Sequence, residues 1–244
     1  MRKYIFLLLV VCILSAIALS KIFVVQDNFY LYLYDLRNKN QRIVSAQQID
    51  SILSEMPSIS FANLDEEYKS KTKSSEKKYS KLLAGSNYKI INRNDFYRKL
   101  VGNYRVRDFV CKDVTYNRAV RNSKKEFYWL MDEKLPKAIL KLQQQLEAKG
   151  YDPDGFRITY GHRHPQRNEA VKGASSSKHI LGQAIDLVVY DINKDGKYSD
   201  VDKQILLDIA EKDVIADKGG IGRYPGTRTV HLDVRGYRAR WDTY

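Results

Sequence analysis

The sequence is poor in cysteine, and this limits how the folded chain can be stabilised. Only Cys12 and Cys111 are cysteines among its 244 residues, and Cys12 lies in the apolar stretch at the start of the chain. If that stretch is removed on export, one cysteine remains and no internal disulfide can form. A small scaffold held by disulfides is therefore excluded, and stability must come from core packing, with a bound metal as a further source.

The first twenty residues, MRKYIFLLLVVCILSAIALS, have the layout of a secretory signal. Arg2 and Lys3 form a cationic start, residues 4–19 form an apolar run, and small residues precede a cleavage point after Ser20. The run is slightly short for a membrane-spanning helix. An uncleaved membrane anchor through residues 4–19 is the alternative. In both cases the protein is expected to be exported, as a periplasmic, cell-wall-associated or extracellular protein.

Acidic residues are too few to balance the basic ones. The chain has 42 Lys and Arg against 29 Asp and Glu, a formal net charge of +13, and its 43% apolar content is typical of a globular protein. In an exported protein this excess favours an anionic surface such as cell-wall polymer or lipid head groups. The basic aromatic run NRNDFYRKLVGNYRVRDF (92–109) would fit nucleic acid. The export signal favours a solvated start of the next domain instead, so we expect no nucleic-acid partner.

Composition divides the chain into three parts. Residues 1–20 are the signal or anchor, residues 21–102 are a small N-terminal region of unclear fold, and residues 103–244 form a well-patterned domain. The role of residues 26–102 is open between a spacer and a docking element.

Three segments of the N-terminal region carry local signals. NFYLYLYDL (28–36) predicts a strand rich in aromatics, and SAQQIDSILSEM (45–56) predicts a helix that begins at a serine cap. KSKTKSSEKKYSK (69–81) is too polar to bury surface and is interpreted as a Lys/Ser-rich linker or loose helix.

The C-terminal part has the pattern of an α+β domain. A helix is predicted with Pro136 in its first turn and Gly150 as its stop, and its apolar stripe is formed by Leu135, Ile139, Leu142 and Leu146. The remaining predicted elements are strands at 156–160 and 184–190, a helix at 201–212 and a hairpin around Pro225–Gly226. This order predicts a mainly antiparallel sheet packed with helices.

Histidine is scarce and concentrated, which points to a metal site. All four histidines lie between residues 162 and 231. In TVHLDV, strand alternation puts His231 and Asp233 on one face and apolar residues on the other. His179 precedes a glycine turn, and Asp186 lies on the strand that follows. The His231–Asp233 pair and the His179–Asp186 pair are each common in proteins. Together, however, two imidazoles and one carboxylate suit a catalytic zinc ion with one open position.

Several segments resemble one family of peptidases. SSKHILGQAID is similar to the SxHxxGxAxD motif of the zinc D-Ala-D-Ala carboxypeptidase family, peptidase family M15. HLDVRGYRARW resembles the HVDVRGxxARW ending of one branch, and GGIGRYP resembles the segment before that ending. YGHRHPQRNEAVKGASSSKH and RDFVCKD resemble earlier segments of the same domain, in the family's order. The resemblance covers residues 103–244 and implies the fold shared by hedgehog signalling domains and D-Ala-D-Ala peptidases.

The resemblance implies roles for individual residues. His179, Asp186 and His231 would bind zinc, Ser177 would line the substrate cleft, and Arg163 would face the substrate carbonyl or carboxylate and stabilise the oxyanion. The sequence departs from the family pattern at Tyr160, His162 and His164, where Ser, Tyr and Ser are usual. This departure puts substrate preference in doubt. Each extra histidine is interpreted as an exposed loop residue, with tuning of the cleft as the alternative.

The general base is a separate question. Some relatives carry a glutamate three positions before the last histidine, where this chain has Arg228. Asp233 is the carboxylate left on the ligand face and is predicted to accept the proton from the attacking water. The alternative is that Asp233 orients His231. Tyr224 is predicted to bind substrate, or else to be an ordinary aromatic residue at a turn.

An acidic loop follows the Asp186 strand. DINKDGKYSDVD (191–202) matches a calcium-loop pattern through Asp191, Asn193, Asp195, Lys197, Ser199 and Asp202. Its last residue is Asp where the pattern has Glu, and a strand leads into it where the pattern has a helix. Calcium is therefore a second expected cofactor, and an acidic turn that caps the next helix is the alternative.

Together these features predict a zinc metallopeptidase that hydrolyses peptide bonds of peptidoglycan, as a D-Ala carboxypeptidase or a cross-link endopeptidase. Its expected partners are peptidoglycan peptides. The alternative is a non-catalytic, zinc-stabilised module that binds the cell wall.

Overall fold

The structure is a computed structural model that describes residues 29, 31–37, 41–112 and 126–242. The predicted signal or anchor lies outside these residues. The chain contains two compact units, residues 1–41 and 42–244. None of the described helices is both long and apolar enough to cross a membrane.

The described part of the first unit is a short helix at residues 31–37. The strand predicted at 28–36 is therefore wrong. A short run of Tyr and Leu satisfies the apolar pattern of a helix as well as that of a strand, so periodicity alone does not separate the two.

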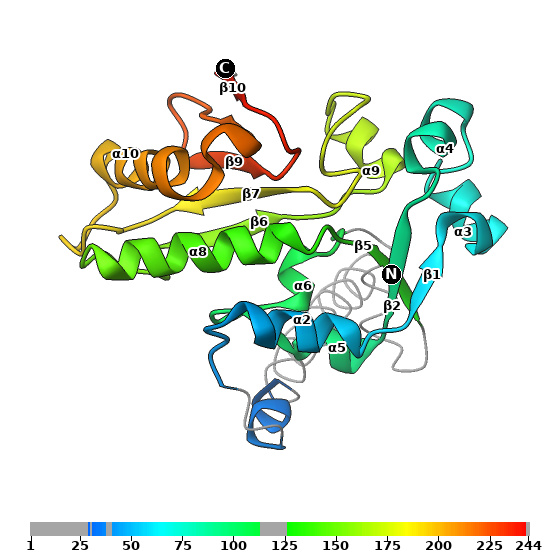
Figure 1. Cartoon of the computed structure of the whole chain (residues 1–244), viewed down its shortest axis with the longest axis horizontal. Helices are drawn as coiled ribbons and strands as arrows, with labels where there is room; N and C mark the ends of the chain where they lie inside the picture. Colours follow the sequence, from blue (N-terminus) through cyan, green and yellow to red (C-terminus); the bar gives the residue numbers. More distant parts are fainter. Residues whose placement is uncertain (1–28, 30, 38–40, 113–125, 243–244) are drawn as a thin grey trace, which may run out of the picture. The chain divides into compact units, whose positions relative to one another are not determined.

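The second unit contains a five-stranded sheet in the order β10-β8-β9-β7-β6. Its strands are β6 (Phe156–Tyr160), β7 (Ala184–Val189), β8 (Gly220–Gly222), β9 (Thr229–Asp233) and β10 (Ala239–Trp241). All neighbours pair antiparallel except β10 and β8. This arrangement confirms the predicted α+β class and the hairpin around Pro225–Gly226. Figure 1 shows β6, β7 and β9 side by side in this sheet.

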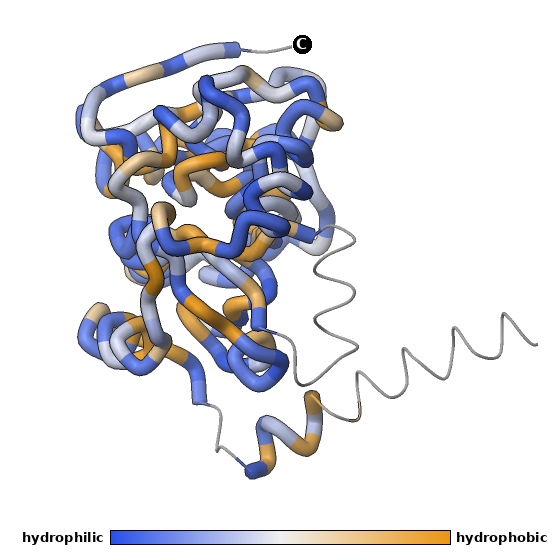
Figure 2. Tube along the Cα trace, turned by 90° about the vertical axis from the view of Figure 1, so that its right-hand side faces the viewer, coloured by the Kyte–Doolittle hydropathy of each residue, from blue (hydrophilic) through white to orange (hydrophobic). Residues whose placement is uncertain are grey.

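The two longest described helices complete one hydrophobic core with this sheet. They are α8 (Lys134–Ala148) and α10 (Asp200–Ile209), which continues through η2 (Ala210–Ile215) and η3 (Ala216–Lys218). The stripe predicted on the first helix is buried, and its residues share a core with β6, β7 and β9. Figure 2 shows hydrophobic and hydrophilic segments alternating along the described chain.

The N-terminal part of the second unit is also folded. It contains β1 (Ser58–Ser60), β2 (Asn87–Ile91) and β5 (Phe127–Leu130) in a three-stranded sheet, and the pair β3 (Lys99–Val101) and β4 (Tyr104–Arg105). The short helices are α2 (Ala46–Ser54), η1 (Phe61–Asn63), α3 (Glu66–Lys71), α4 (Lys77–Leu83), α5 (Arg93–Tyr97), α6 (Val106–Phe109) and α9 (Pro165–Ala170). The predicted helix at 45–56 is confirmed, with Ser45 as its cap.

Residues 69–81 are not a solvated linker. They contribute to α3 and α4 and bury Lys69 and Tyr79. Lys69 is buried because its ammonium donates to the carbonyl of Ala62 and to Glu66. The predicted limit between residues 102 and 103 falls inside the compact unit 42–244.

Candidate metal centre

Two of the predicted zinc ligands face each other across neighbouring strands. Asp186 lies on β7, His231 lies on β9, and the antiparallel register pairs these two residues directly. Directly opposed residues of an antiparallel pair project to the same face with their Cβ atoms about 5 Å apart. The register alone therefore brings this carboxylate and this imidazole together.

The third predicted ligand comes from a turn. The carbonyl of His179 accepts hydrogen bonds from the backbone of Arg163 (3.0 Å) and of Gly182 (3.2 Å), which fixes the chain before β7. Gly182 has a φ of +65°, and a Cβ at this residue would overlap the carbonyl oxygen of Leu130. The glycine thus allows the turn to approach β5 closely and to direct His179 at the sheet.

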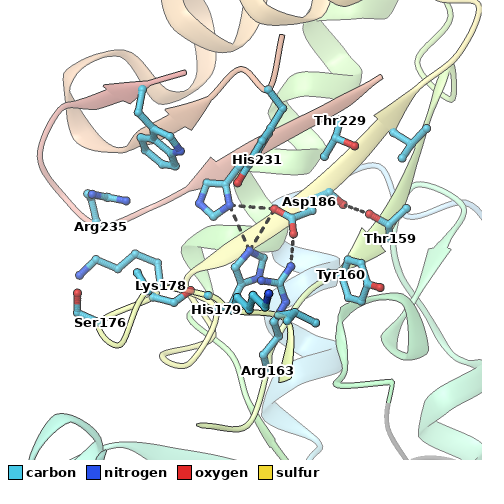
Figure 3. A pocket seen from close by; sticks show the side chains of 18 of the residues that line it. Thr159, Tyr160, Arg163, Ser176, Lys178, His179, Asp186, Thr229, His231 and Arg235 are labelled. Carbon is cyan, nitrogen blue, oxygen red and sulfur yellow. Dashed lines mark hydrogen bonds and ion pairs between the residues drawn. The ribbon is translucent and has the colours of Figure 1, made fainter. Parts of the chain in front are cut away.

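Three side-chain atoms converge from these elements (Figure 3). Nε2 of His179 lies 3.1 Å from Oδ1 of Asp186 and 3.2 Å from Nδ1 of His231, and the last two atoms are 2.9 Å apart. Donors about 2.0–2.2 Å from a tetrahedral zinc ion lie about 3.3 Å from one another. The triangle therefore has the size and the donor types of a zinc site, and all three residues are buried.

In each imidazole, the ring nitrogen that points away from the shared centre donates a hydrogen bond. Nδ1 of His179 donates to the carbonyl of Gly161 over 2.7 Å, and Nε2 of His231 donates to Oδ2 of Asp233 over 3.2 Å. Each ring is thereby held in the tautomer whose lone pair points to the shared centre. Such outer hydrogen bonds are the usual companions of metal-ligating histidines.

Asp233 is placed behind His231 and not in the pocket. The residue is fully buried, and its carboxylate accepts hydrogen bonds from the backbone of Gly220 (3.0 Å) and from the guanidinium of Arg235 (2.5 and 2.8 Å). Burial opposes ionisation, but His231 and Arg235 hold the pKa of Asp233 well below its usual range. Asp233 therefore contacts His231 and Arg235 and is not among the residues that line the pocket.

The pocket beside the three ligands has a volume of about 980 Å³. Arg163, Ser177 and Tyr224 are among the residues that line it. Arg163 makes an ion pair with Oδ2 of Asp186 and stacks 4.8 Å from the ring centre of Tyr160. Burial raises the pKa of Tyr224, so its phenol stays protonated at neutral pH.

His162 and His164 are not exposed and do not line this pocket. They are 2% and 1% exposed, and their rings contact each other with centres 5.3 Å apart. His164 hydrogen-bonds Tyr68, and His162 packs against Tyr88. The interpretation of these histidines as exposed loop residues is therefore wrong, because Tyr68 and Tyr88 of the N-terminal part of the unit pack against them.

The acidic loop uses its oxygens internally. Asp202 is fully buried and accepts hydrogen bonds from the backbones of Ile192, Asn193 and Ser199. Asp191 accepts from Asp195 and Gly196, and the side chain of Asp195 accepts from Lys197. Among the described residues, His179, Asp186 and His231 form the one group of His, Cys, Asp and Glu that could hold a metal. The predicted calcium site is thus not supported, and the loop has the hydrogen bonds of a turn that caps α10.

Several residues that line the pocket were not predicted from the sequence, among them Lys178, Arg235, Tyr237 and Trp241. A local signal existed for Arg235, because strand alternation continues from His231 through Asp233. Lys178 directly precedes a ligand, but a lysine in a polar turn gives no signal of its own.

An antiparallel sheet with a His-Asp-His group at a pocket is typical of a metal-dependent hydrolase. A family model described as Peptidoglycan L,D-endopeptidase MepK (Peptidase_M15_2) matches residues 88–241. The match covers more than half of the chain, so this protein belongs to that family of M15 peptidases, as its motifs predict. No curated protein and no solved structure matches significantly.

Proposed function

We propose that this protein is a zinc-dependent endopeptidase that cleaves peptide bonds in peptidoglycan cross-links. The observation that carries the proposal is the triangle of His179, Asp186 and His231 at the wall of the pocket. Endopeptidase activity is favoured over removal of a terminal D-Ala by the description of the matching family.

The residues of the site have distinct tasks in this proposal. Zinc held by the three ligands supplies Lewis-acid polarisation of the scissile carbonyl and of a water molecule. Arg163 holds Asp186 through the oxygen that faces away from His179 and presents a positive charge to the oxyanion. The protonated phenol of Tyr224 donates a hydrogen bond to the substrate, and Ser177 lines the cleft.

Asp233 acts through His231 in this account. Its ionised carboxylate, fixed by Arg235 and Gly220, keeps the proton of His231 on Nε2. Among the described residues that line the pocket, Asp186 is the one carboxylate, and its oxygens face the other ligands and Arg163.

The reaction takes place outside the cytoplasm in this proposal. A family that acts on peptidoglycan favours a periplasmic or extracellular location, and the signal-like residues 1–20 agree with it. The net charge of +13 complements an anionic cell wall. Residues 4–19 remain a candidate membrane anchor.

Digestion of intact peptidoglycan tests the proposal. The purified chain, with zinc or after chelation, is incubated with sacculi, and the released fragments are identified by mass. We expect zinc-dependent conversion of cross-linked dimers to monomers, and no conversion by a His231→Ala variant. Loss of single alanines would instead identify a carboxypeptidase. Binding to sacculi without any cleavage would support the non-catalytic wall-binding module.

A further inference from the structure

The charges that line the pocket are unbalanced. Four cationic residues line it (Arg163, Lys172, Lys178 and Arg235) together with a single carboxylate, Asp186. Arg163 pairs with Asp186, and Arg235 pairs with Asp233. In the part of the chain that the structure describes, no ion pair joins Lys172 or Lys178 to a carboxylate.

Lys178 is held in the wall of the pocket beside a metal ligand. The residue precedes His179 and is half-buried. Its backbone carbonyl accepts hydrogen bonds from Leu181 (3.2 Å) and Gln183 (3.0 Å), so the start of its side chain is fixed. Its ammonium lies 5.9 Å from the ring centre of Tyr237. Lys172, by contrast, is exposed on the rim.

Lys178 lies to one side of the three ligands (Figure 3). In Figure 3, Ser176, Lys178 and Arg235 lie on one side of the three ligands. Thr159, Tyr160 and Thr229 lie on the other side. A peptide that runs along this pocket with its scissile bond at the ligands would place a neighbouring residue on the side of Lys178.

We propose that Lys178 is a specificity-determining residue that binds a free carboxylate on the peptide residue next to the scissile bond. The inference rests on the proposed function and adds a substrate preference to it. The ammonium of this half-buried lysine, near the ring of Tyr237, can bind a carboxylate by a charge-assisted hydrogen bond. If the carboxylate of this substrate residue is converted to an amide, it carries no charge to pair with the ammonium. A substrate with the free acid should therefore be preferred over its amidated form, by about tenfold in kcat/KM.

Two synthetic cross-linked peptides that differ only in free or amidated carboxylates beside the cleaved bond test this inference. For the wild type we expect the acid to be cleaved about tenfold better than the amide, mainly through KM. Lys178→Met should reduce this ratio to about twofold or less, because cleavage of the free-acid peptide slows while cleavage of the amidated peptide does not. Lys178→Arg should retain much of the preference. Lys81→Met, which removes an exposed lysine of α4 outside the pocket, is the matched control and should keep the full preference.

Binding measured by calorimetry with the same two peptides separates the inference from the proposed function. Tighter binding of the acid that is lost in Lys178→Met supports the inference, even if neither peptide is cleaved and the proposed function fails. Equal binding and equal cleavage of acid and amide by the wild type would overturn the inference while leaving the peptidase intact. A preference that survives in Lys178→Met would overturn it as well.

Discussion

Asp233 accepts a hydrogen bond from Nε2 of His231 over 3.2 Å, while Nδ1 of the same ring lies 2.9 Å from Asp186. The two nitrogens of His231 therefore serve two different carboxylates. Asp186 shares the ligand triangle, and Asp233 sets which nitrogen carries the proton. Whether Asp233 orients His231 or accepts a proton from water can therefore be tested by measuring metal affinity.

Replacing Asp233 by Asn should weaken zinc binding more than it impairs chemistry. The amide cannot hold the His231 proton as the carboxylate does, so we expect zinc affinity to fall about 10- to 100-fold. Cleavage should recover substantially at saturating zinc. Zinc competition with a chromogenic chelator and kcat at full occupancy measure the two effects. Asp242→Asn, which breaks the exposed pair with Arg223, is the control. If Asp233→Asn remains inactive with zinc fully bound, Asp233 is the proton acceptor.

Lys203 should position Tyr224. Lys203 is 7% exposed, and its ammonium donates hydrogen bonds to the carbonyls of Tyr224 (2.9 Å) and Thr227 (2.7 Å). Tyr224 has a φ of +40°. A positive φ is strained for tyrosine and needs such support. Lys203→Met should lower kcat and reduce stability by about 1–3 kcal/mol.

A double-mutant cycle separates this positioning from general destabilisation. If Lys203 acts through Tyr224, Lys203→Met should lower kcat much less in a Tyr224→Phe background. Unfolding curves of the same variants measure stability separately. Fully additive effects on kcat would contradict the positioning role. Lys212→Met removes an exposed lysine outside the pocket and should change neither quantity.

Glu169 should make stability depend on pH in the acidic range. The hydrogen bonds from Lys73 (2.6 Å) and Lys78 (2.9 Å), with one from Tyr79, lower the pKa of Glu169 to about 2 from an ordinary 4.5. Because the pKa is lower in the folded state, these interactions stabilise the protein fully above pH 4.5. Their contribution is lost as pH falls from 4.5 toward 2.

Denaturation at several pH values checks this dependence. The stability difference between the wild type and Glu169→Gln should be constant from pH 7 to pH 5 and should shrink below pH 4.5. Since Glu169 is partly exposed, the difference should also decrease in high salt. Glu67→Gln, which breaks an exposed pair with Lys71, should show a smaller effect throughout. A difference that is independent of pH would argue against the ion pairs.

Gly182 and Gly150 provide a matched pair of substitutions. Both have positive φ, +65° and +82°, but only at Gly182 would a Cβ overlap backbone atoms. Gly150→Ala should cost about 1–2 kcal/mol, the penalty for a left-handed residue. Gly182→Ala should cost at least about 3 kcal/mol and should weaken zinc binding, because its turn carries His179. If the two substitutions lowered the free energy of unfolding in urea equally, the turn at Gly182 would have moved to make room for the added Cβ, contrary to this prediction.

Local patterns in the sequence were sufficient to predict the strands that carry Asp186 and His231, which lie near His179 in the group that could hold a metal. Alternation in TVHLDV put His231 and Asp233 on one face, and the structure confirms the strands and the hairpin. The stripe on α8 was readable because its spacing is that of a buried helix face.

Contacts between distant segments could not be read in this way. The position of Asp233 depends on Gly220 in the neighbouring strand, and the burial of His164 depends on Tyr68, 96 residues earlier. Residues 69–81 look solvated by composition, yet Tyr79 of this segment is buried and donates a hydrogen bond to Glu169 of α9. Such pairings are set by tertiary packing and leave no periodic signal.

The central claim is that His179, Asp186 and His231 bind one zinc ion through Nε2, Oδ1 and Nδ1. Anomalous diffraction at the zinc absorption edge, from crystals of the zinc-loaded protein, tests it most directly. We expect one strong peak about 2.0–2.2 Å from each of these three atoms. A peak at other residues, coordination of His231 through Nε2, or no peak in zinc-saturated crystals would contradict the account.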